Sequence, residues 1–166
     1  NSTLVLADAQ IEQAGNYSVV VNNPYGSITS TPALLDVAMV VSWGNNSFGQ
    51  NNLPTGLGRV ISIASGDYHN LALRTDGTVS VWGNNDFGQR NAPPGLTNVI
   101  AVAGGGKHSL ALTADGRVTP WGDNSSGQIA VPVGLSGGVA VGAGGSHFVV
   151  ALTAPARAAK DARNAT

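Results

Sequence analysis

The sequence predicts an all-β protein: a partial β-propeller, with about three blades of antiparallel strands in an open arc, preceded by a fragment of a second all-β domain. Three observations predict this fold class. The chain repeats at a fixed interval, its short apolar runs have the pattern of strands, and its 166 residues include 23 Gly and 8 Pro. Gly and Pro together are well above the roughly 12% of average usage, which disfavours long helices.

The repeat is clearest at tryptophan. Trp43, Trp82 and Trp121 are equally spaced along the chain. The segments that begin there, Trp-Gly-Asn-Asn-Ser-Phe-Gly-Gln, Trp-Gly-Asn-Asn-Asp-Phe-Gly-Gln and Trp-Gly-Asp-Asn-Ser-Ser-Gly-Gln, align without a gap. Other residue types recur at the same spacing: Pro54, Pro93 and Pro132; Gly56, Gly95 and Gly134; His69, His108 and His147. A period of about 39 residues indicates small units that stack on one another.

Each unit is predicted to be an antiparallel meander of three strands. In the first complete unit, residues 60–64 and 71–73 are short apolar runs, and residues 79–82 alternate between apolar and polar. These patterns are typical of strands. Because a sheet of this size cannot bury both of its faces alone, the units are expected to stack radially, as the blades of a propeller do.

Turn residues separate the predicted strands. The dipeptides Asp76-Gly77 and Asp115-Gly116 suit a two-residue hairpin loop in which both central residues have positive φ. A short fourth strand is expected near residues 50–53 and 89–92, where the proline that follows would end it.

The third unit departs from the pattern. Its segment His147–Leu152 looks one residue longer than His108–Leu112, and Ala154-Pro155 stands where the Asp-Gly turn is due. Lys160 occupies the position of a fourth tryptophan. Residues 154–166 are rich in alanine and carry a net charge of +2, so a frayed helix or a disordered tail is expected there.

The repeated motif points to a known family. The pattern Trp-Gly-x-Asn-x-x-Gly-Gln, then Pro, then Ala-x-Gly-x-x-His-x-Leu-Ala-Leu-x-x-Asp-Gly-x-Val resembles the repeats of the regulator of chromosome condensation superfamily. It is similar in particular to the short-repeat branch that includes the propeller-type β-lactamase inhibitory protein. The resemblance covers residues 40–153 and implies a propeller, usually of seven blades in this family. Only about three units are present, and the chain begins at Asn1, so it is interpreted as a piece of a longer protein.

Residues 1–38 have neither this period nor any Lys or Arg, and their net charge is −3. Residues 13–27 resemble the last hairpin of a bacterial immunoglobulin-like domain, with Tyr17 in the place of the tyrosine corner. Gln13 and Val19 depart from that pattern, which usually has Asp and, in disulfide-bonded members, Cys. The segment 34–41 is expected to lead into the first propeller strand with almost no linker. The predicted domains are therefore an immunoglobulin-like fragment (1–38), three propeller repeats (39–153) and a tail (154–166).

Composition excludes several function classes. Eight Lys or Arg against nine Asp or Glu give a net charge of −1, so the basic surface that binds nucleic acid is missing. The chain has no Cys, which excludes disulfides, cysteine zinc sites and thiol nucleophiles. No apolar run approaches the ~20 residues of a membrane span, so no membrane insertion is expected.

No catalytic or cofactor site is predicted. The repeated histidines are interpreted as donors of a repeated side-chain-to-backbone hydrogen bond rather than as metal ligands, and the tryptophans as core residues between blades. Asp76 and Asp115 are assigned to turns, and no pair of carboxylates suited to glycoside hydrolysis is singled out. The run Gly104–Lys107 lacks the spacing of a phosphate-binding loop. We expect no enzyme activity, no metal and no cofactor.

Binding is predicted for the loops in which the repeats differ, because loops on a rigid scaffold carry specificity. Aromatic side chains beside charges are typical of interface hot spots. The alternative is that these residues are ordinary solvated loop tips. The candidate protein-binding residues are Phe48, Tyr68, Asp86, Phe87, Arg90 and Lys107.

The predicted function is a non-enzymatic protein- or glycan-binding or structural module of a larger bacterial secreted or cell-surface protein. One alternative is a carbohydrate-active enzyme with Asp67 or Asp123 in a propeller channel. Another is nucleotide exchange on a small GTPase, as the family resemblance suggests, which would need an organised charged face. Three units leave two ends uncovered, so Trp43 is expected to be less buried than Trp82. The end blades are expected to self-associate or to leave the fold marginally stable.

Overall fold

The computed structural model describes residues 15–35 and 40–153 of the chain. Its contacts divide the chain into two compact units, Asn1–Val41 and Ser42–Thr166, which are considered separately. Within the described residues all regular structure is strand, so the all-β prediction is confirmed. None of the described segments is a helix that could cross a membrane. The predicted tail at 154–166 and part of the predicted connection at 34–41 lie outside the described residues.

The described residues of the N-terminal unit form one hairpin with two antiparallel ladders. The strand β2 (Val20–Asn23) pairs with β3 (Gly26–Thr29), and β1 (Gly15–Tyr17) pairs with β4 (Ala33–Leu35). At the tip, the Tyr25 backbone N–H donates to the side-chain Oδ1 of Asn23 at 2.8 Å, a local bond typical of Asn in turns. The strands expose most of their side chains, and the assignment to an immunoglobulin-like domain stays a prediction.

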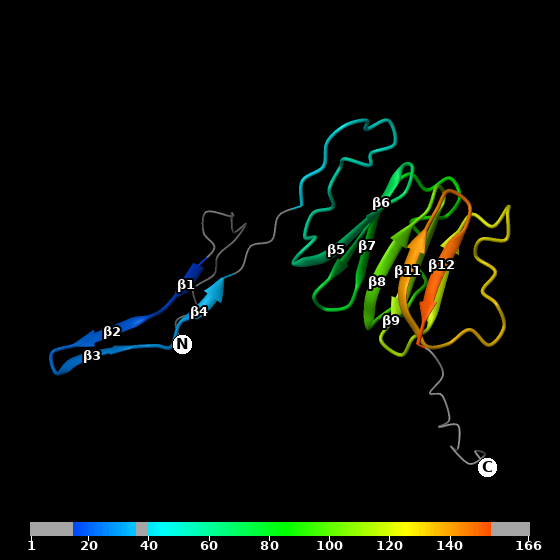
Figure 1. Ribbon diagram of the computed structural model, residues 1–166. Helices are drawn as coiled ribbons and strands as arrows, with labels where there is room; N and C mark the ends of the chain where they lie inside the picture. Colours follow the sequence, from blue (N-terminus) through cyan, green and yellow to red (C-terminus); the bar gives the residue numbers. More distant parts are fainter. Residues whose placement is uncertain (1–14, 36–39, 154–166) are drawn as a thin grey trace, which may run out of the picture. The chain divides into compact units, whose positions relative to one another are not determined.

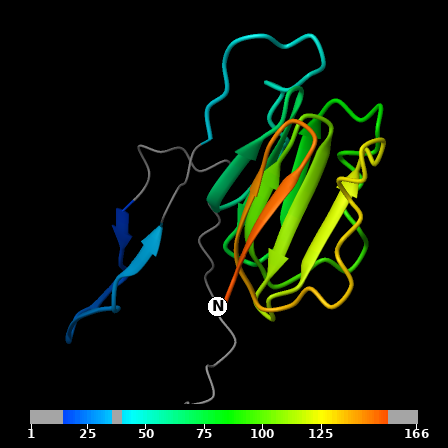
Figure 2. The same cartoon turned by 45° about the vertical axis from the view of Figure 1, so that its right-hand side comes forward.

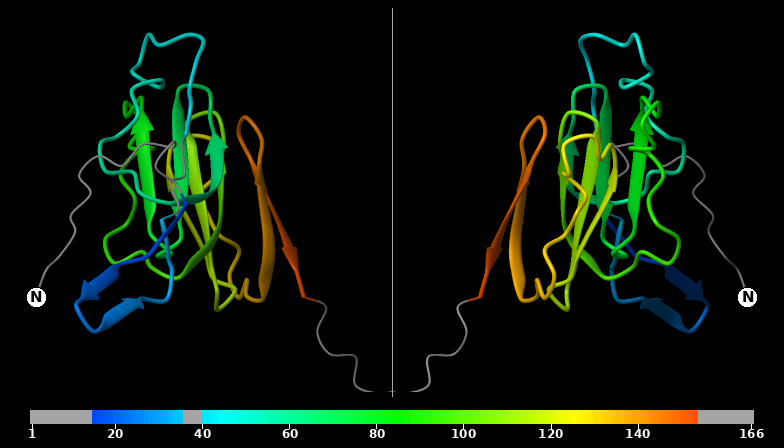
Figure 3. Two further views of the ribbon diagram at one scale, coloured as in Figure 1. Left: turned by 90° about the vertical axis from the view of Figure 1, so that its left-hand side faces the viewer. Right: turned by 90° about the vertical axis from the view of Figure 1, so that its right-hand side faces the viewer.

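The second unit contains the repeats as successive antiparallel sheets (Figures 1 and 2). The sheets lie side by side in chain order, with β8 against β5 and β6, and β11 against β8 and β9. In both views of Figure 3 the orange hairpin β11–β12 forms one margin of the unit. The arrangement is an open part of a propeller, as predicted. The strands are β5 (Val60–Ser65), β6 (His69–Arg74), β7 (Val79–Gly83), β8 (Val99–Gly104), β9 (His108–Thr113), β10 (Val118–Gly122), β11 (Gly138–Ala143) and β12 (Phe148–Leu152).

All three repeats keep the same register. The first strand of each has a bulge at equivalent positions, between Val60 and Ser62, Val99 and Ala101, and Gly138 and Ala140. In the third repeat Ala143 pairs with Phe148, one full repeat after the pair Gly104 and Ser109. The prediction that the third repeat is one residue longer is therefore wrong. It aligned Leu152 with Leu112 because both end an apolar run, whereas the strand pairing places Leu152 opposite Gly138, as Thr113 is opposite Val99.

The Asp-Gly turns differ from the prediction. Only the glycine has positive φ, at 75° in Gly77. The closing bond joins the Arg74 N–H to the Thr78 carbonyl at 2.9 Å, so the loop has three residues and ends in a left-handed glycine. Asp76 stays outside that region because its carboxylate accepts the Thr78 N–H at 3.0 Å.

The predicted fourth strand is also wrong. Residues 50–53 and 89–92 are turns and irregular backbone in the structure. The carbonyls of Gln50 and Gln89 accept hydrogen bonds from tryptophan side chains instead of strand partners. These segments therefore pack across the sheets rather than extending them.

The core lies between the first two sheets. Leu71, Leu73, Val99, Ala111 and Trp121 are buried against one another. Among the tryptophans, Trp82 is 6% exposed and Trp121 is 5% exposed, whereas the Trp43 side chain is 83% exposed. The expected difference between Trp43 and Trp82 is confirmed, because Trp43 precedes the first sheet and has no earlier sheet to pack against.

Candidate functional site

The loops predicted to bind lie at one end of the sheets. His69 pairs with Gly83, and His108 pairs with Gly122. The turn before each histidine and the loop after each of these glycines therefore leave a sheet at the same end, which we call the histidine end. The Asp-Gly turns lie at the opposite end (Figure 1).

At the histidine end, side chains from the two kinds of loop meet in pairs. The rings of Phe48 and Tyr68 lie 4.7 Å apart between centroids, tilted by 53°. The Nζ of Lys107 lies 4.2 Å from the centroid of the Phe87 ring, within the range of a cation–π contact. The second pair follows the first by one repeat at both positions. We call these contacts the loop pairs. Their three aromatic side chains are each a little under half exposed.

The loop that carries Phe87 is held by its own side chains. The Oδ1 of buried Asn84 accepts the Asp86 N–H at 2.9 Å and the Gln89 Nε2–H at 2.8 Å. The Phe87 N–H donates to Gln89 Oε1 at 2.9 Å. The Phe48 N–H makes the same bond to Gln50 at 2.9 Å. The repeated Asn and Gln therefore fix the loop, a role that the sequence reasoning missed although their constant spacing marks it.

Two of the predicted binding residues also support this loop. The Oδ2 of Asp86 accepts from Asn84 Nδ2 at 2.9 Å. An Arg90 guanidinium nitrogen donates to the Gly83 carbonyl at 3.2 Å. Both side chains are exposed, but their bonds lie within the loop. The structure thus brings Phe48 to Tyr68 and Phe87 to Lys107, with Asp86 and Arg90 on the same loop as Phe87.

The repeated histidines link neighbouring sheets. His69 is 1% exposed, and its Nε2 lies 2.9 Å from the Ser109 Oγ. Ser109 donates its hydroxyl hydrogen to the Gln89 carbonyl at 2.9 Å, so His69 Nε2–H is the donor to Ser109. Trp121 Nε1–H donates to the same carbonyl at 2.8 Å. The predicted bond from the histidine side chain to backbone is therefore wrong for His69: a serine hydroxyl lies between the ring and the carbonyl.

Burial controls the protonation of these rings. Loss of hydration lowers the pKa of His69 to about 4, the nearby His108 contributes in the same direction, and Asp67 opposes it. Burial also lowers the pKa of His108. Both side chains are therefore neutral at pH 7. His147, in the last repeat, is exposed.

The junction with the third repeat is built differently. Phe148 stands where the second repeat has Ser109, and its ring packs edge-on against His108 at 4.5 Å between centroids. Within the described ranges, neither ring nitrogen of His108 has a hydrogen-bond partner. The same residues include no group of three His, Asp or Glu that could hold a metal ion.

Three aspartates accept hydrogen bonds within their own turns. The Thr78 hydroxyl lowers the pKa of Asp76, and the Thr113 hydroxyl does the same to Asp115. For Asp123 the main cause of the lowered pKa is the Ser125 backbone N–H. Each carboxylate is thus held ionised as a turn residue.

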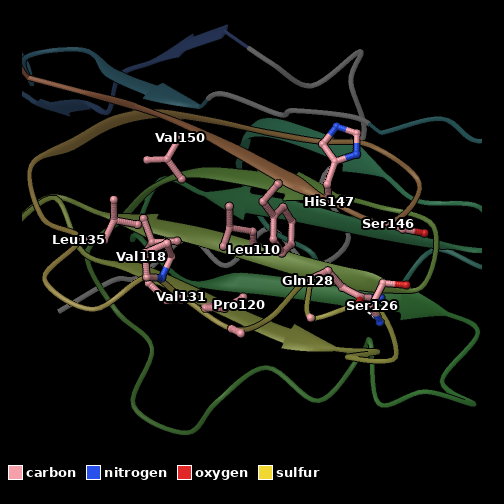
Figure 4. A pocket seen from close by; sticks show the side chains of 14 residues that line it. Leu110, Val118, Pro120, Ser126, Gln128, Val131, Leu135, Ser146, His147 and Val150 are labelled. Carbon is pink, nitrogen blue, oxygen red and sulfur yellow. Dashed lines mark hydrogen bonds between the residues drawn. The ribbon is translucent and has the colours of Figure 1, made fainter.

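A cleft of about 400 Å³ lies beside the hairpin β11–β12. Figure 4 shows Leu135, Val118 and Val150 toward one end of it, and Ser126 and Ser146 toward the other. Ser126 and Ser146 occupy the positions of the loop pairs in the third repeat. A second hollow, of about 640 Å³, lies at the opposite end of the sheets between residues 93–98 and 113–119.

The repeats match a known family. The family model of the regulator of chromosome condensation (RCC1) repeat matches residues 60–89 and 99–128. These two segments are therefore similar to RCC1 repeats, as the sequence motif predicted. No curated protein gives a significant match to the sequence.

Solved structures show the same fold. The chain is similar to the crystal structure of Kap60 bound to yeast RCC1 (Prp20), with a TM-score of 0.55 and 19% identity, over 80% of this chain and 48% of that one. It is similar to human WBSCR16, with a TM-score of 0.55 and 22% identity, over 79% of this chain and 50% of that one. The ectodomain of the Physcomitrella patens receptor kinase CR4 has a TM-score of 0.55 and 26% identity, over 66% of this chain and 32% of that one. The chain thus spans half the length of these structures or less.

Proposed function

We propose that the chain is a non-enzymatic protein-binding module that contacts its partner through the loop pairs at the histidine end. The observation that carries the proposal is the recurrence of the pair Phe48–Tyr68 as Phe87–Lys107 in the neighbouring repeat. In both pairs a half-exposed phenylalanine ring lies on a loop that internal hydrogen bonds fix. The ring packs against the side chain of its partner, Tyr68 or Lys107. A few side chains supply most of the binding energy at protein interfaces, and aromatic residues and Arg are enriched among them.

The chemistry of the pairs indicates the kind of partner. Two aromatic rings lie at the first pair, and a ring beside the cation of Lys107 lies at the second, with exposed Arg90 nearby in sequence. A partner segment with apolar side chains flanked by carboxylates fits this order of groups. The third pair of positions, Ser126 and Ser146, offers neither ring nor charge, so the contact is centred on the first two repeats.

The fold of the structural neighbours is consistent with protein binding. The crystal structure of Kap60 bound to yeast RCC1 contains a protein of this fold in a complex with another protein. The finer setting is also part of the proposal: a larger bacterial secreted or cell-surface protein of the short-repeat branch. The support for it is the sequence motif together with the resemblance of residues 13–27 to an immunoglobulin-like hairpin, in a region where β1 pairs with β4 and β2 with β3.

The alternatives lack a supporting observation. The carbohydrate-active alternative needs free carboxylates facing one sugar, whereas Asp123 is bonded to Ser125 and Gln128 in its own loop. The exchange-factor alternative needs an organised charged face. Among the described residues, the cations at the histidine end are Lys107, which lies over the Phe87 ring, and Arg90, which donates to the Gly83 carbonyl. We therefore retain binding as the function.

The proposal is tested by selecting ligands for the whole chain. The immobilised chain is used to pan a random peptide library and a glycan array, and the affinity of each selected ligand is then measured by surface plasmon resonance. The double variants Phe48→Ala with Tyr68→Ala, and Phe87→Ala with Lys107→Ala, are each expected to weaken peptide binding about tenfold or more. Arg117→Ala, an exposed cation in the turn at the opposite end, is the matched control and is expected to leave affinity unchanged.

Two results would overturn the proposal. One is selected peptides whose affinity depends on Arg117 and not on the loop pairs. The other is recovery of glycans instead of peptides, with binding lost in the loop-pair variants, which would assign the same surface to sugars. Thermal melting of every variant distinguishes loss of contact from loss of fold.

A further inference from the structure

The cleft beside β12 is lined by residues equivalent to those that surround Trp121 one repeat earlier. Trp121 lies in a cluster between the first two sheets. Six members of that cluster, moved by one repeat along the chain, become residues that line the cleft. These six correspond as follows: Leu71 to Leu110, Val79 to Val118, Val81 to Pro120, Ala92 to Val131, Leu96 to Leu135 and Ala111 to Val150. The cleft is therefore equivalent to the site that Trp121 fills one repeat earlier.

The hydrogen-bond pattern leads to the same conclusion. Trp82 Nε1–H donates to the Gln50 carbonyl at 2.9 Å, and Trp121 Nε1–H donates to the Gln89 carbonyl at 2.8 Å. The next residue in this series is Gln128, which lines the cleft (Figure 4). No indole among the described residues donates to its carbonyl. In the sequence, the position of the corresponding tryptophan is Lys160.

Among the described residues, the third sheet also has one strand fewer than the other two. The first two sheets each have three strands, whereas β11 and β12 form a sheet of two in the part of the chain that the structure describes. In the complete sheets the third strand pairs with the middle one, so that Trp82 lies opposite Asn70 and Trp121 opposite Ser109. The equivalent place is opposite Phe148 on β12.

The chain carries the missing strand at its other end. Residues 40–44, Val-Val-Ser-Trp-Gly, stand one repeat before β7, Val-Ser-Val-Trp-Gly. They form no strand in the structure, and the Trp43 side chain is 83% exposed. In the second unit, Trp43 precedes the first sheet and the cleft follows the second sheet, so the two surfaces belong to opposite ends of the array.

We propose that the cleft is a docking site for the Trp43 strand of a second copy of this chain. Residues 40–44 of the incoming copy pair antiparallel with β12, with Trp43 opposite Phe148. The indole enters the cleft, and its Nε1–H donates to the Gln128 carbonyl. Residues 40–44 and the cleft are different surfaces of the chain. A dimer formed by one such contact therefore still has a free Trp43 segment on one copy and a free cleft on the other, so association proceeds head to tail. This proposal does not rest on the loop surface proposed above.

The experiment uses the 166-residue chain and two variants that each remove one side of the contact. Trp43→Ala removes the donor, and Val131→Arg places a charge in the cleft at a partly exposed position. Sedimentation velocity over a concentration series is expected to show growing assemblies for the unchanged chain and a monomer for each variant. An equal mixture of the two variants retains one complete contact and is expected to stop at a dimer. Tyr25→Ala changes another exposed aromatic residue, outside residues 40–44, the loop pairs and the cleft. It is the control and should assemble like the unchanged chain.

A peptide probe makes the test independent of folding defects in a variant. A synthetic peptide of residues 37–50 is expected to cap the unchanged chain and halt its growth, while the same peptide with Ala at position 43 has no effect. A monodisperse monomer at every concentration would overturn the proposal. Assembly that persists in both Trp43→Ala and Val131→Arg, or that both peptides leave unchanged, would show another contact and would equally overturn it.

Discussion

The two junctions between repeats share a backbone arrangement but differ in their side chains. At the junction of the first two sheets, Ser109 and Trp121 both donate to the carbonyl of Gln89, and His69 donates to the Ser109 hydroxyl. At the next junction, His108 packs against Phe148, and the equivalent of Trp121 is replaced by a cleft. The comparison teaches that a repeat does not complete its own core, because the outer strand of the following repeat supplies the tryptophan.

The backbone contacts are the same at both junctions. At the histidine end, the Asp67 N–H donates to the Gly106 carbonyl at 3.3 Å, and the Gly106 N–H donates to the Gly145 carbonyl at 3.2 Å. At the opposite end, the Val99 N–H donates to the Gly77 carbonyl at 3.1 Å, and the next junction repeats this bond with Gly116 as acceptor at 3.0 Å. The sheets therefore stack in the same way whether or not the side-chain contacts are complete.

The largest expected effect distinguishes the filled junction from the uncovered end. Trp121→Ala removes a buried ring and its bond to Gln89, and we expect the free energy of unfolding to fall by about 3 to 5 kcal/mol. Trp43→Ala removes an exposed ring and should change it by less than about 0.5 kcal/mol. Urea denaturation at a concentration where the chain is monomeric measures both values. Equal losses in the two variants would contradict the comparison.

The second effect is a dependence of stability on pH. The pKa of His69 is lowered from 6.5 to about 4 in the folded state, so the unfolded chain binds more protons between these values. Stability is complete above about pH 6.5 and falls as the pH approaches 4, by about 3 kcal/mol for this group. Burial lowers the pKa of His108 too, so it acts in the same direction.

Denaturation at a series of pH values, with NMR titration of the imidazole of His69, tests this dependence. The variant His69→Gln, which lacks the imidazole, should lose the part of the slope that belongs to this group. A stability that is constant between about pH 7 and pH 4 would contradict the neutral, buried state of His69.

A third, smaller effect compares equivalent glycines. A Cβ at Gly106 would lie 2.8 Å from the Gly145 carbonyl oxygen and 3.1 Å from an Asp67 carboxylate oxygen, whereas at Gly145 nothing lies within 4 Å. Gly106→Ala is therefore expected to destabilise the fold by about 1 to 3 kcal/mol through overpacking. Gly145→Ala should be near neutral, since no following repeat lies against it within the described residues. The two thermal melting curves test this difference, and coincident curves would contradict it.

The smallest effect concerns the loop pairs. Lys107→Ala removes the contact with the Phe87 ring, and an exposed cation–π pair contributes only about 0.5 to 1 kcal/mol. The double-mutant cycle of Lys107→Ala and Phe87→Ala measures this coupling energy. A coupling near zero would mean that the pair is a chance approach of two exposed side chains.

The sequence predicts the repeat, the strands and the exposed tryptophan because side-chain letters recur with the period of the structure. It fails where backbone atoms decide the outcome. The carbonyls of Gln50 and Gln89 accept tryptophan bonds, and a carbonyl acceptor leaves no mark in the sequence. For the same reason the predicted fourth strand is absent and the bond of His69 was assigned to the wrong partner.

The sequence predicted the residues of the candidate site but not which of them contact each other. Phe48 and Tyr68 lie on different loops, as do Phe87 and Lys107, and only the fold shows that each couple meets. The Asp-Gly turns were placed correctly, but their length was not, because the side chain of Asp76 bonds to Thr78 and keeps its own φ negative.

The dependence of each core on the tryptophan of the following repeat has a consequence for biosynthesis. A growing chain that leaves the ribosome cannot close the core around Leu71 until Trp121 has been translated. Folding of this array is then expected to trail synthesis by about one repeat, with the N-terminal sheets ordered first. The newest repeat is always the one with an open core, so a nascent chain exposes one such site at a time instead of several.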